Sequence, residues 1–384
     1  MKQMLAIFGL MVGMAPISYR SVLTEKTTIY SILNPAAIAQ ESSNPGPSEL
    51  IPYRMGDKWG FSDANKKLII QARYDEVLLF TDGLARVKLN GKYGFIDKSG
   101  KEVIPPKYDN ASIFFHDELP RVKLNGKYGF IDMNGAEVIP CKYDDAVRFS
   151  EGLAAVKLNG KYGFIDMSGK EVIAFKYDNA MGFSEGLAVV RLKDKYGFID
   201  KSGKEVIPLK YDDAVSFYGG LAGVRLNGKG QEEQFGLVDK SGNEVIPVKY
   251  EHVGNLSESL VSVELNGKYG YLDKSGREMI SFRYEGTNFF SDGLAAVRLD
   301  AKYGYIDKKG EEVIPLKYER AWEFSEGLAC VKLNGKYGYL DKTGKEVIPL
   351  KYDNAVPFSH GLARVWVNKK EGYIGRDGTE YFEP

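Results

Sequence analysis

The chain has 384 residues, of which 43% are hydrophobic, 12% aromatic and 27% charged, so it can bury a core and is not a disordered chain. Lysine plus arginine equal aspartate plus glutamate at 52 each, which argues against a nucleic-acid binder, because such a protein gathers a basic excess on one face. The two cysteines, Cys141 and Cys330, fit neither a disulfide framework nor a metal-ligand spacing, and we expect both to be packing residues.

Residues 1–39 are typical of an export signal. Lys2 is followed by an apolar run from Met4 to Ile17, which is shorter than the ~20 residues of a membrane-spanning helix. We expect a secreted or periplasmic protein, cleaved after Ala39 or nearer Gly13; an uncleaved leader is the alternative. Residues 40–52, rich in Ser, Pro and Gly, are expected to form a flexible linker before a repeat array at 53–384.

An aromatic residue followed by glycine recurs along the rest of the chain. It stands at Trp59, Tyr93, Tyr128, Tyr162, Tyr196, Phe235, Tyr269, Tyr303 and Tyr337. The step is 34 or 35 residues except between Tyr196 and Phe235, where it is 39 because about five polar residues are inserted at an expected hairpin tip. A period of this length indicates an array of nine to ten similar units.

Each unit contains a β-hairpin. In "AAVKLNGKYGFID", residues 154–166, Asn159-Gly160 lies between two alternating runs and favours a two-residue type I′ turn, which needs positive φ at both positions. This turn places Val156 opposite Gly163, with Tyr162 and the second residue after it on one face of the hairpin. Glycine inside a strand often marks a close backbone approach, and we expect the neighbouring unit to fill the space beside Gly163.

A second turn and a third strand complete the unit. In "DKSGKE", Asp97 can start a type I turn and Gly100 can take the left-handed conformation of a three-residue hairpin loop. The following "EVIP" predicts a short strand halted by a proline such as Pro105. No segment has a sustained helical period, so we predict an all-β array with about three short strands per unit.

These residues resemble the WG-repeat family, also called KWG repeats, whose motif stands unaltered at Lys58-Trp59-Gly60. Later copies keep the glycine and replace the tryptophan by tyrosine or, once, phenylalanine, and the resemblance covers about residues 53–384. It implies a mostly bacterial protein whose repeats mediate interactions, with no shared catalytic residues to carry over.

Two architectures fit such an array. Three strands in 34 residues are fewer than the four strands in ~40–45 residues of a usual propeller blade, and nine to ten units exceed the usual four to eight blades. We therefore predict an open solenoid or superhelix of stacked β-hairpin repeats, in which the atypical first and last copies act as caps. The alternative is a closed, propeller-like toroid.

The titratable residues form no catalytic pattern. His116, His252 and His360 occupy non-equivalent, turn-like positions, and we expect satisfied or solvated surface histidines rather than a catalytic base. The repeated turn aspartate, such as Asp97, is followed by lysine and not by further oxygen ligands, so we expect it to cap its turn rather than bind a metal. We predict no enzymatic activity, no metal and no cofactor.

Two aromatic rows are the candidate binding residues or, in the simpler interpretation, part of the core. The first row, which we single out as the binding row, is Trp59, Tyr93, Tyr128, Tyr162, Tyr196, Tyr269, Tyr303 and Tyr337. The second row is Tyr108, Tyr143, Tyr177, Tyr211, Tyr250, Tyr284, Tyr318 and Tyr352. Aligned by stacked units, such rows could hold a polysaccharide or an extended polypeptide.

Together these observations predict a non-enzymatic, exported repeat scaffold that mediates protein–protein interaction in the cell envelope. The alternative is a glycan-binding or cell-wall-binding module that uses the aromatic rows, and a weaker third is a hydrolase in which one unit departs from the others. The expected partner is a protein or an envelope polysaccharide, with no nucleic acid and no stable membrane span.

Overall fold

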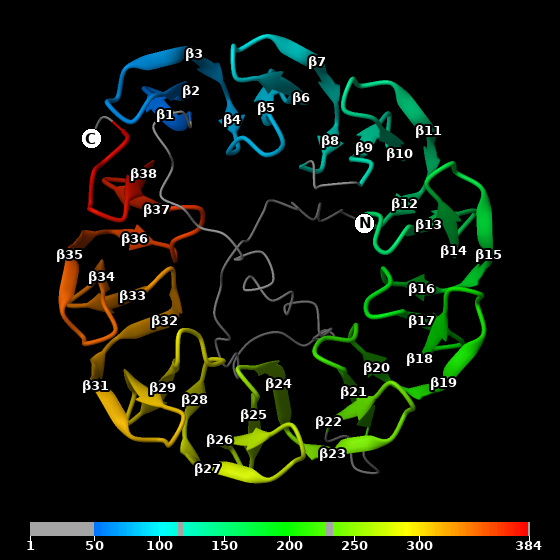
Figure 1. Ribbon diagram of the computed structural model, residues 1–384, viewed down its shortest axis with the longest axis vertical. Helices are drawn as coiled ribbons and strands as arrows, with labels where there is room; N and C mark the ends of the chain where they lie inside the picture. Colours follow the sequence, from blue (N-terminus) through cyan, green and yellow to red (C-terminus); the bar gives the residue numbers. More distant parts are fainter. Residues whose placement is uncertain (1–49, 114–117, 228–232, 383–384) are drawn as a thin grey trace, which may run out of the picture.

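The computed structural model describes residues 50–113, 118–227 and 233–382, which form a closed ring of ten antiparallel sheets (Figure 1). We call each sheet a blade, number the blades in chain order, and call the interface of two neighbouring blades a joint. Eight blades have four strands, and the first and tenth have three. Within a blade the chain runs strand by strand from the ring's axis to its rim.

The strands fall into four positions. The innermost strands are β4 (Glu76–Val77), β8 (Asn110–Ala111), β12 (Asp145–Ala146), β16 (Asn179–Ala180), β20 (Asp213–Ala214), β24 (His252–Ser257), β28 (Gly286–Thr287), β32 (Arg320–Ser325) and β36 (Asn354–Ala355). The second strands are β1 (Ile51–Met55), β5 (Leu84–Leu89), β9 (Arg121–Leu124), β13 (Leu153–Leu158), β17 (Leu187–Leu192), β21 (Leu221–Asn227), β25 (Leu260–Leu265), β29 (Leu294–Leu299), β33 (Leu328–Leu333) and β37 (Leu362–Val367). The third strands are β2 (Lys58–Ser62), β6 (Lys92–Asp97), β10 (Lys127–Ile131), β14 (Lys161–Asp166), β18 (Lys195–Asp200), β22 (Glu233–Asp239), β26 (Lys268–Asp273), β30 (Lys302–Asp307), β34 (Lys336–Leu340) and β38 (Lys370–Gly375). The outermost strands are β3 (Leu68–Tyr74), β7 (Glu102–Tyr108), β11 (Glu137–Tyr143), β15 (Glu171–Tyr177), β19 (Glu205–Tyr211), β23 (Glu244–Tyr250), β27 (Glu278–Tyr284), β31 (Glu312–Tyr318) and β35 (Glu346–Tyr352).

The prediction of an open solenoid is wrong, because the sheets close into a ten-bladed propeller, the architecture held as the alternative. Nine of the ten blades also have an innermost strand that the pattern did not predict, and it is the fourth strand in eight of them. In most blades this innermost strand has only two residues, too few for a periodic signal, which lets four strands fit into 34 residues. The first and last blades do not cap a stack; they pack against each other.

The hairpin prediction is confirmed in detail. Asn159 and Gly160 have φ of 51° and 80°, as a type I′ turn requires. In the β13–β14 pair, Lys157 lies opposite Tyr162 and Val156 lies opposite Gly163. The 39-residue step is also placed as expected, because the extra residues lie between β21 and β22, the two strands of the same hairpin in blade 6.

The space beside Gly163 is filled by its own blade, and the expectation that the neighbouring unit fills it is wrong. A Cβ on Gly163 would lie 2.6 Å from the carbonyl oxygen of Ile173 and 3.0 Å from the backbone nitrogen of Phe175, both in β15. The β14–β15 pairing shifts register between Tyr162 and Phe164, so a bulge brings the outermost strand over the glycine. The repeated glycine therefore fixes the shape of each blade.

The core is a set of apolar layers between blades. Tyr162 and Phe164 face blade 5, where Phe164 packs on Phe183 with ring centroids 5.1 Å apart. On the other face of the same blade, Val156 and Ile165 belong to the joint with blade 3. Each blade is thus apolar on both faces and needs a neighbour on each side.

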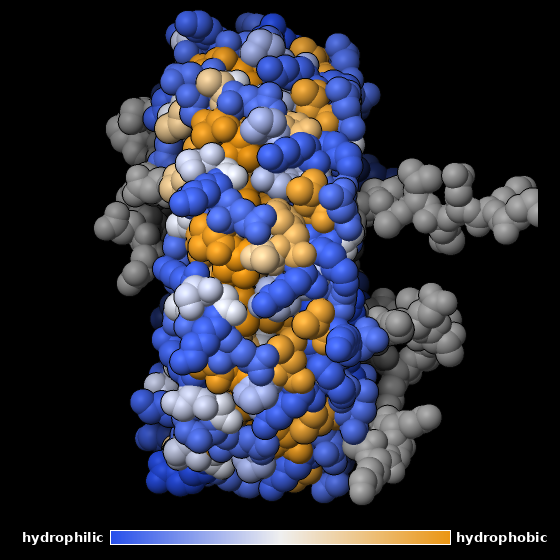
Figure 2. All heavy atoms as spheres, turned by 90° about the vertical axis from the view of Figure 1, so that its right-hand side faces the viewer, coloured by the Kyte–Doolittle hydropathy of each residue, from blue (hydrophilic) through white to orange (hydrophobic). Residues whose placement is uncertain are grey.

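The two cysteines lie in separate joints, as the packing prediction expected. Cys330 is fully buried between blades 9 and 10, and Cys141 is half-buried between blades 2 and 3. Six of the nine outermost strands carry a proline, such as Pro208 in β19, which removes an N–H from the exposed edge and so discourages pairing with another chain. Figure 2 shows one side of the rim as hydrophobic patches among hydrophilic ones. The exposed hydrophobic residues of the outermost strands include Val172 and Val206.

Candidate interaction surfaces

The first aromatic row places one residue on the third strand of each of eight blades, and blades 6 and 10 have Phe235 and Glu371 at this position. Tyr162, Tyr196 and Tyr337 are only 7 or 8% exposed. The other five, Trp59, Tyr93, Tyr128, Tyr269 and Tyr303, are half-buried. A cation of the second strand covers several of the rings; in blade 4 the Lys157 ammonium lies 5.4 Å from the centroid of the Tyr162 ring. Binding of a ligand by this row stays a prediction.

The second aromatic row lies at the ends of the outermost strands and is buried. Tyr177 is 2% exposed and contributes to the joint between blades 4 and 5. The preceding lysine, Lys176, lies with its ammonium 5.1 Å from the Tyr177 ring centroid. These tyrosines therefore fill the joints, while their lysine neighbours reach the surface.

One face of the ring carries the Asn-Gly turns, and we call it the hairpin face. Here Lys161 of blade 4 binds Asp178, with Nζ 2.5 Å from Oδ1. The other oxygen of Asp178 accepts a hydrogen bond from the backbone N–H of Lys193, in the hairpin turn of blade 5, at 2.9 Å. The Lys161 contact is the main cause that lowers the pKa of Asp178. The same lysine–aspartate pair recurs at Lys58–Asp75, Lys92–Asp109, Lys127–Asp144, Lys195–Asp212 and Lys336–Asp353.

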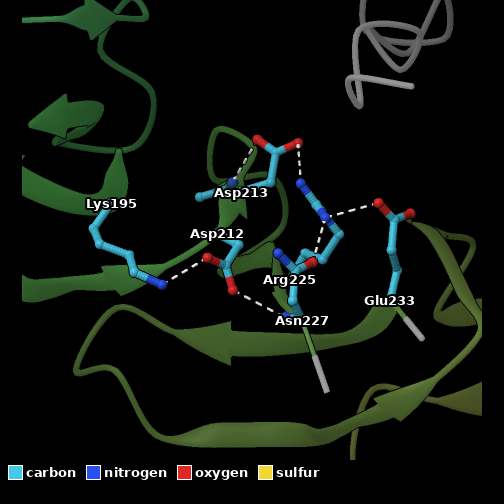
Figure 3. A network of polar contacts seen from close by, with 7 residues as sticks. Lys195, Asp212, Asp213, Arg225, Asn227 and Glu233 are labelled. Atoms are coloured by element: carbon cyan, nitrogen blue, oxygen red, sulfur yellow. Dashed lines mark hydrogen bonds and ion pairs between the residues drawn. The ribbon is translucent and has the colours of Figure 1, made fainter. Parts of the chain in front are cut away.

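Blade 6 departs from this scheme at its innermost strand. In blade 4 the hydroxyl of Tyr162 donates to Asp145 at 2.5 Å, but the tyrosine's equivalent in blade 6 is Phe235, which has no hydroxyl. The aspartate equivalent to Asp145 is Asp213, which is 3% exposed, and an arginine guanidinium, that of Arg225, lies 3.9 Å from it (Figure 3).

Arg225 links that buried aspartate to the base of the longer hairpin. Its Nη1 donates to Oδ1 of Asn227 at 2.7 Å and to Oε1 of Glu233 at 2.8 Å (Figure 3). Asn227 and Glu233 face each other at the last described pair of the hairpin. The arginine thus replaces the missing hydroxyl and holds together the two strands that carry the insertion.

The repeated turn aspartates cap their turns, as predicted. Oδ1 of Asp97 accepts the backbone N–H of Ser99 at 2.9 Å and that of Lys101 at 3.1 Å. The Ser99 hydroxyl donates to the same oxygen at 2.6 Å and is the main cause that lowers the pKa of Asp97. Across residues 50–113, 118–227 and 233–382, no three His, Cys, Asp or Glu side chains gather as a metal site would require.

The histidines lie in different blades. His252 begins β24, where its ring lies 5.9 Å from that of Tyr269, and burial lowers its pKa. His252 is half-buried, and the expectation of a satisfied or solvated histidine fails for its Nδ1, which is buried without a hydrogen-bond partner among the described residues. His360 is exposed in a loop of blade 10, with its Nδ1 2.9 Å from the Ser359 hydroxyl. His116 lies outside the described residues.

The opposite face carries the "FSEG" loops, which join innermost to second strands, and the "DKSG" turns, and we call it the loop face. Glu185 of blade 5 accepts a hydrogen bond from the backbone N–H of Gly220 in blade 6 at 3.0 Å. Its carboxylate also binds Lys240, in the "DKSG" turn of blade 6, at 3.1 Å. We call an acid held by these two donors of the next blade a loop bridge. The equivalent acid–lysine pairs are Glu151–Lys201, Glu258–Lys308 and Asp292–Lys342.

Sequence reasoning missed the loop bridges, although both partners repeat. The acid of "FSEG" and the lysine of "DKSG" recur once per unit in much of the array, but they are about 50 residues apart and pair across a joint. Only the order of blades around the ring brings the two together.

The joint between blades 6 and 7 lacks a loop bridge. The loop of blade 6 reads Tyr218-Gly219-Gly220, so that glycine stands at the position of the acid. An open hollow of about 510 Å³ lies there, lined in part by Tyr218, Gly219, Leu256 and Phe290. The Tyr218 side chain is 43% exposed.

The WG containing repeat family model matches nine consecutive segments, residues 59–93, 93–128, 128–162, 162–196, 196–229, 235–269, 269–303, 303–337 and 337–370. No curated protein sequence matches the chain significantly. Among solved structures, a eukaryotic initiation factor is similar with a TM-score of 0.54 and 14% identity, over 75% of this chain and 92% of that one. Dihydro-heme d1 dehydrogenase NirN has a TM-score of 0.38 and 14% identity, over 80% of this chain and 75% of that one. Kluyveromyces lactis Hsv2 has a TM-score of 0.35 and 10% identity, over 66% of this chain and 90% of that one. At these identities the first likeness concerns the fold alone, and the other two carry no argument.

Proposed function

Because the chain belongs to the family of proteins built from WG-containing repeats, we propose that it is a non-enzymatic scaffold, exported to the cell envelope, whose ring binds a protein partner. The observation that supports the proposal is the set of contacts that the repeated acidic side chains make. The acids hold turns and neighbouring blades, as Asp97, Asp178 and Glu185 do, rather than converging in one pocket. Their chemistry supports the fold and leaves the surface for recognition.

The loop face offers the protein partner an anchoring surface. At the joint of blades 6 and 7, Tyr218 is exposed and lines the open hollow together with Leu256. Exposed tyrosines beside apolar side chains are enriched at the centres of protein interfaces, where they bury large area with little loss of entropy. Ring-shaped propellers present such loops on a rigid support, which lowers the ordering cost of binding.

Export rests on residues 1–39, which lie outside the described residues. The part of the chain that the structure describes has no helix able to cross a membrane. The location is tested by expressing the full chain with a C-terminal tag in the native cell and separating cytoplasm, membranes, periplasm and medium. Recovery of a shortened chain outside the cytoplasm supports export, and a full-length cytoplasmic chain contradicts it.

The protein-binding proposal is tested with the immobilised full-length protein and a detergent extract of the envelope. A Tyr218→Ser variant is the test variant, because serine stands at this position in blades 4, 5, 7, 8, 9 and 10. We expect a protein that the wild type retains saturably, that Tyr218→Ser retains poorly, and that binds again when purified. Equal retention by both proteins, or no retained protein, contradicts the proposal, as does hydrolysis of an envelope polymer.

A glycan is the second candidate ligand, and the first aromatic row is the observation that favours it. Half-buried rings stand beside carboxylates there, as Tyr93 does with its hydroxyl 3.3 Å from Glu76. An aromatic face next to hydrogen-bonding groups suits a sugar ring. Co-sedimentation with insoluble cell-wall polysaccharide, competed by soluble sugar and lost in Tyr93→Ala, supports this candidate; sedimentation that soluble sugar does not reduce contradicts it.

A further inference from the structure

The loop bridges show which groups the fold provides to hold a carboxylate. In each bridge the acid lies where two donors of the next blade converge: a backbone N–H, such as that of Gly220, and an ammonium, such as that of Lys240. For Glu258 the N–H contact is 3.1 Å and the ammonium contact is 2.9 Å, whereas the Lys342 ammonium lies farther from Asp292, at 3.8 Å. A carboxylate gains a charge-assisted hydrogen bond from each donor.

At the joint of blades 6 and 7 the donors are kept and the acceptor is absent. The lysine equivalent to Lys240 is Lys274, which has no acidic partner among the described residues. The N–H equivalent to that of Gly220 is that of Ser259, an exposed residue whose backbone N–H has no acceptor among the described residues. The acid position itself is Gly219, which borders the hollow.

We propose that this joint binds a carboxylate supplied by the partner protein: an acidic side chain placed over Gly219, with an adjacent apolar residue resting on Tyr218 and Leu256. The inference rests on the proposed protein-binding function and names the chemistry of its site. The partner's carboxylate would take the place that Glu185 and Glu258 take at the neighbouring joints, and would bind the Lys274 ammonium and the Ser259 N–H.

The local geometry suits an occupant from outside. The backbone at Gly219 has φ of 60°, close to the 53° of Glu185, so the loop keeps the shape of a bridge-forming loop. A Cβ on Gly219 would meet only the tip of Leu256, at 3.0 Å from Cδ2, so the space above the glycine is bordered by a side chain that can move. Glu258, which also lines the hollow, has its charge balanced by Lys308 and so repels an incoming carboxylate weakly.

The chain's own loop supplies the probe. A fluorescent, end-blocked peptide of sequence Phe-Ser-Glu-Gly carries the carboxylate of a loop bridge and one apolar side chain, and its binding to the full-length protein is measured by fluorescence anisotropy. We expect saturable binding, weakened at least about tenfold when glutamine replaces the glutamate, the factor expected for one charge-assisted hydrogen bond. The binding of a Phe-Ser-Gly-Gly peptide with a free C-terminus shows whether the site distinguishes a terminal carboxylate from a side-chain carboxylate. Equal binding of the glutamate and glutamine peptides would overturn the proposal.

Three variants locate the peptide. Gly219→Glu supplies the acid internally, and we expect it to raise the melting temperature and weaken peptide binding at least about tenfold. Lys274→Met should weaken binding severalfold and still fold, because methionine stands at the same position in Met133 and Met167. Lys240→Met, which removes the lysine of the intact bridge to Glu185, is the matched control and should leave binding unchanged. Peptide binding that survives both Gly219→Glu and Lys274→Met contradicts the proposal.

The same variants separate this inference from the proposed function. If the wild type and Gly219→Glu retain the same envelope protein equally, the protein-binding function stands and the carboxylate site is wrong. If the wild type retains no envelope protein, the proposed function fails, and the peptide titration still decides whether the joint binds a carboxylate.

Discussion

Two joints connect neighbouring blades by different means. They are the joint between blades 4 and 5 and the joint between blades 10 and 1. The first buries eleven apolar side chains, among them Tyr162 and Phe183. The second, which closes the ring, buries three, Ile51, Leu362 and Tyr381, with three more partly buried. Closure of the ring therefore depends on a thinner apolar layer than its other joints do.

Specific contacts of the chain ends supplement that thin layer. Arg54 of β1 donates to the carbonyl oxygen of Glu371 at 3.2 Å and forms a parallel bridge with Phe382. The Phe382 ring lies over Gly372, at the place that the outermost strand fills beside Gly163. The residues after β38 thus replace the strand that blade 10 lacks. We conclude that the two chain ends hold the ring shut.

Removing blade 10 should break the ring with the largest effect. Deletion of residues 353–384 removes β36–β38 and leaves the apolar faces of blades 9 and 1 exposed. We expect a loss of unfolding free energy beyond the ~5 kcal/mol that single substitutions seldom reach, measured by urea denaturation. An open stack would lose stability only in proportion to its length, so a folded, slightly less stable product would count against closure.

Gly163→Val should be the most damaging single change within a regular blade. Its Cβ would lie 2.6 Å from the Ile173 carbonyl oxygen, and backbone cannot yield as a side chain can. We expect a loss of about 3 kcal/mol or more by urea denaturation. Gly182→Ala is the control, because its Cβ would have an ordinary contact of 3.5 Å with Ser150, and it should be nearly neutral. Similar midpoints for the two variants would refute the bulge as the reason for the glycine.

Equivalent leucines compare the two kinds of joint. Leu362 begins the second strand of blade 10 and lies in the closing joint, whereas Leu187 has the same place in blade 5 and lies in a regular joint. We expect Leu187→Ala to cost about 3 kcal/mol and Leu362→Ala about 2, because the thinner layer relaxes more easily. Hydrogen exchange should become faster in β1 and β38 only for Leu362→Ala. Faster exchange in these strands in both variants would contradict the difference between the closing joint and a regular joint.

The smallest expected effect concerns the hairpin face and depends on pH. The pKa of Asp178 is lowered in the folded protein, so its contribution to stability is present above the ordinary aspartate range near 3.9 and is lost as the pH falls through the lower folded value. Asp178→Asn should cost about 0.5 kcal/mol at pH 7 and less near pH 2, since the pair with Lys161 is partly exposed. Asp194→Asn, which changes an exposed turn aspartate of blade 5 in the same way, serves as the matched control. A cost for Asp178→Asn that is equal at both pH values would contradict the assignment.

Local features were predictable because adjacent residues determine them. Asn159-Gly160 sets a turn whose length fixes which residues face each other, and Asp97 caps a turn within its own reach. Ring closure was not predictable in this way, because it depends on the small rotation between neighbouring blades, summed over ten joints. No short sequence motif determines that rotation. The fourth strand was missed since two residues such as Asn179–Ala180 have no period to detect.

The candidate site was missed for a related reason. Gly219 is a single change at one position of a long repeat array. Its role could be inferred only from the contact between Glu185 and Lys240 across a joint. The tyrosines were easy to find as a row, but sequence could not tell a filled joint from an open surface, as Tyr177 shows by its burial. Pairings between blades are what the sequence alone did not reveal.

The most direct test of closure is a pulsed electron–electron distance between spin labels on blades 1 and 10. Cysteines replace Asp57 and Lys369, exposed turn residues of these two blades on the hairpin face, in a chain carrying Cys141→Leu and Cys330→Ala. Labels at Asn159 and Lys193, on the hairpin tips of blades 4 and 5, give the distance of a regular joint. A closed ring predicts similar, narrow distributions for both pairs. A much longer or undetectable distance for the first pair, with the second unchanged, would contradict the closed ring.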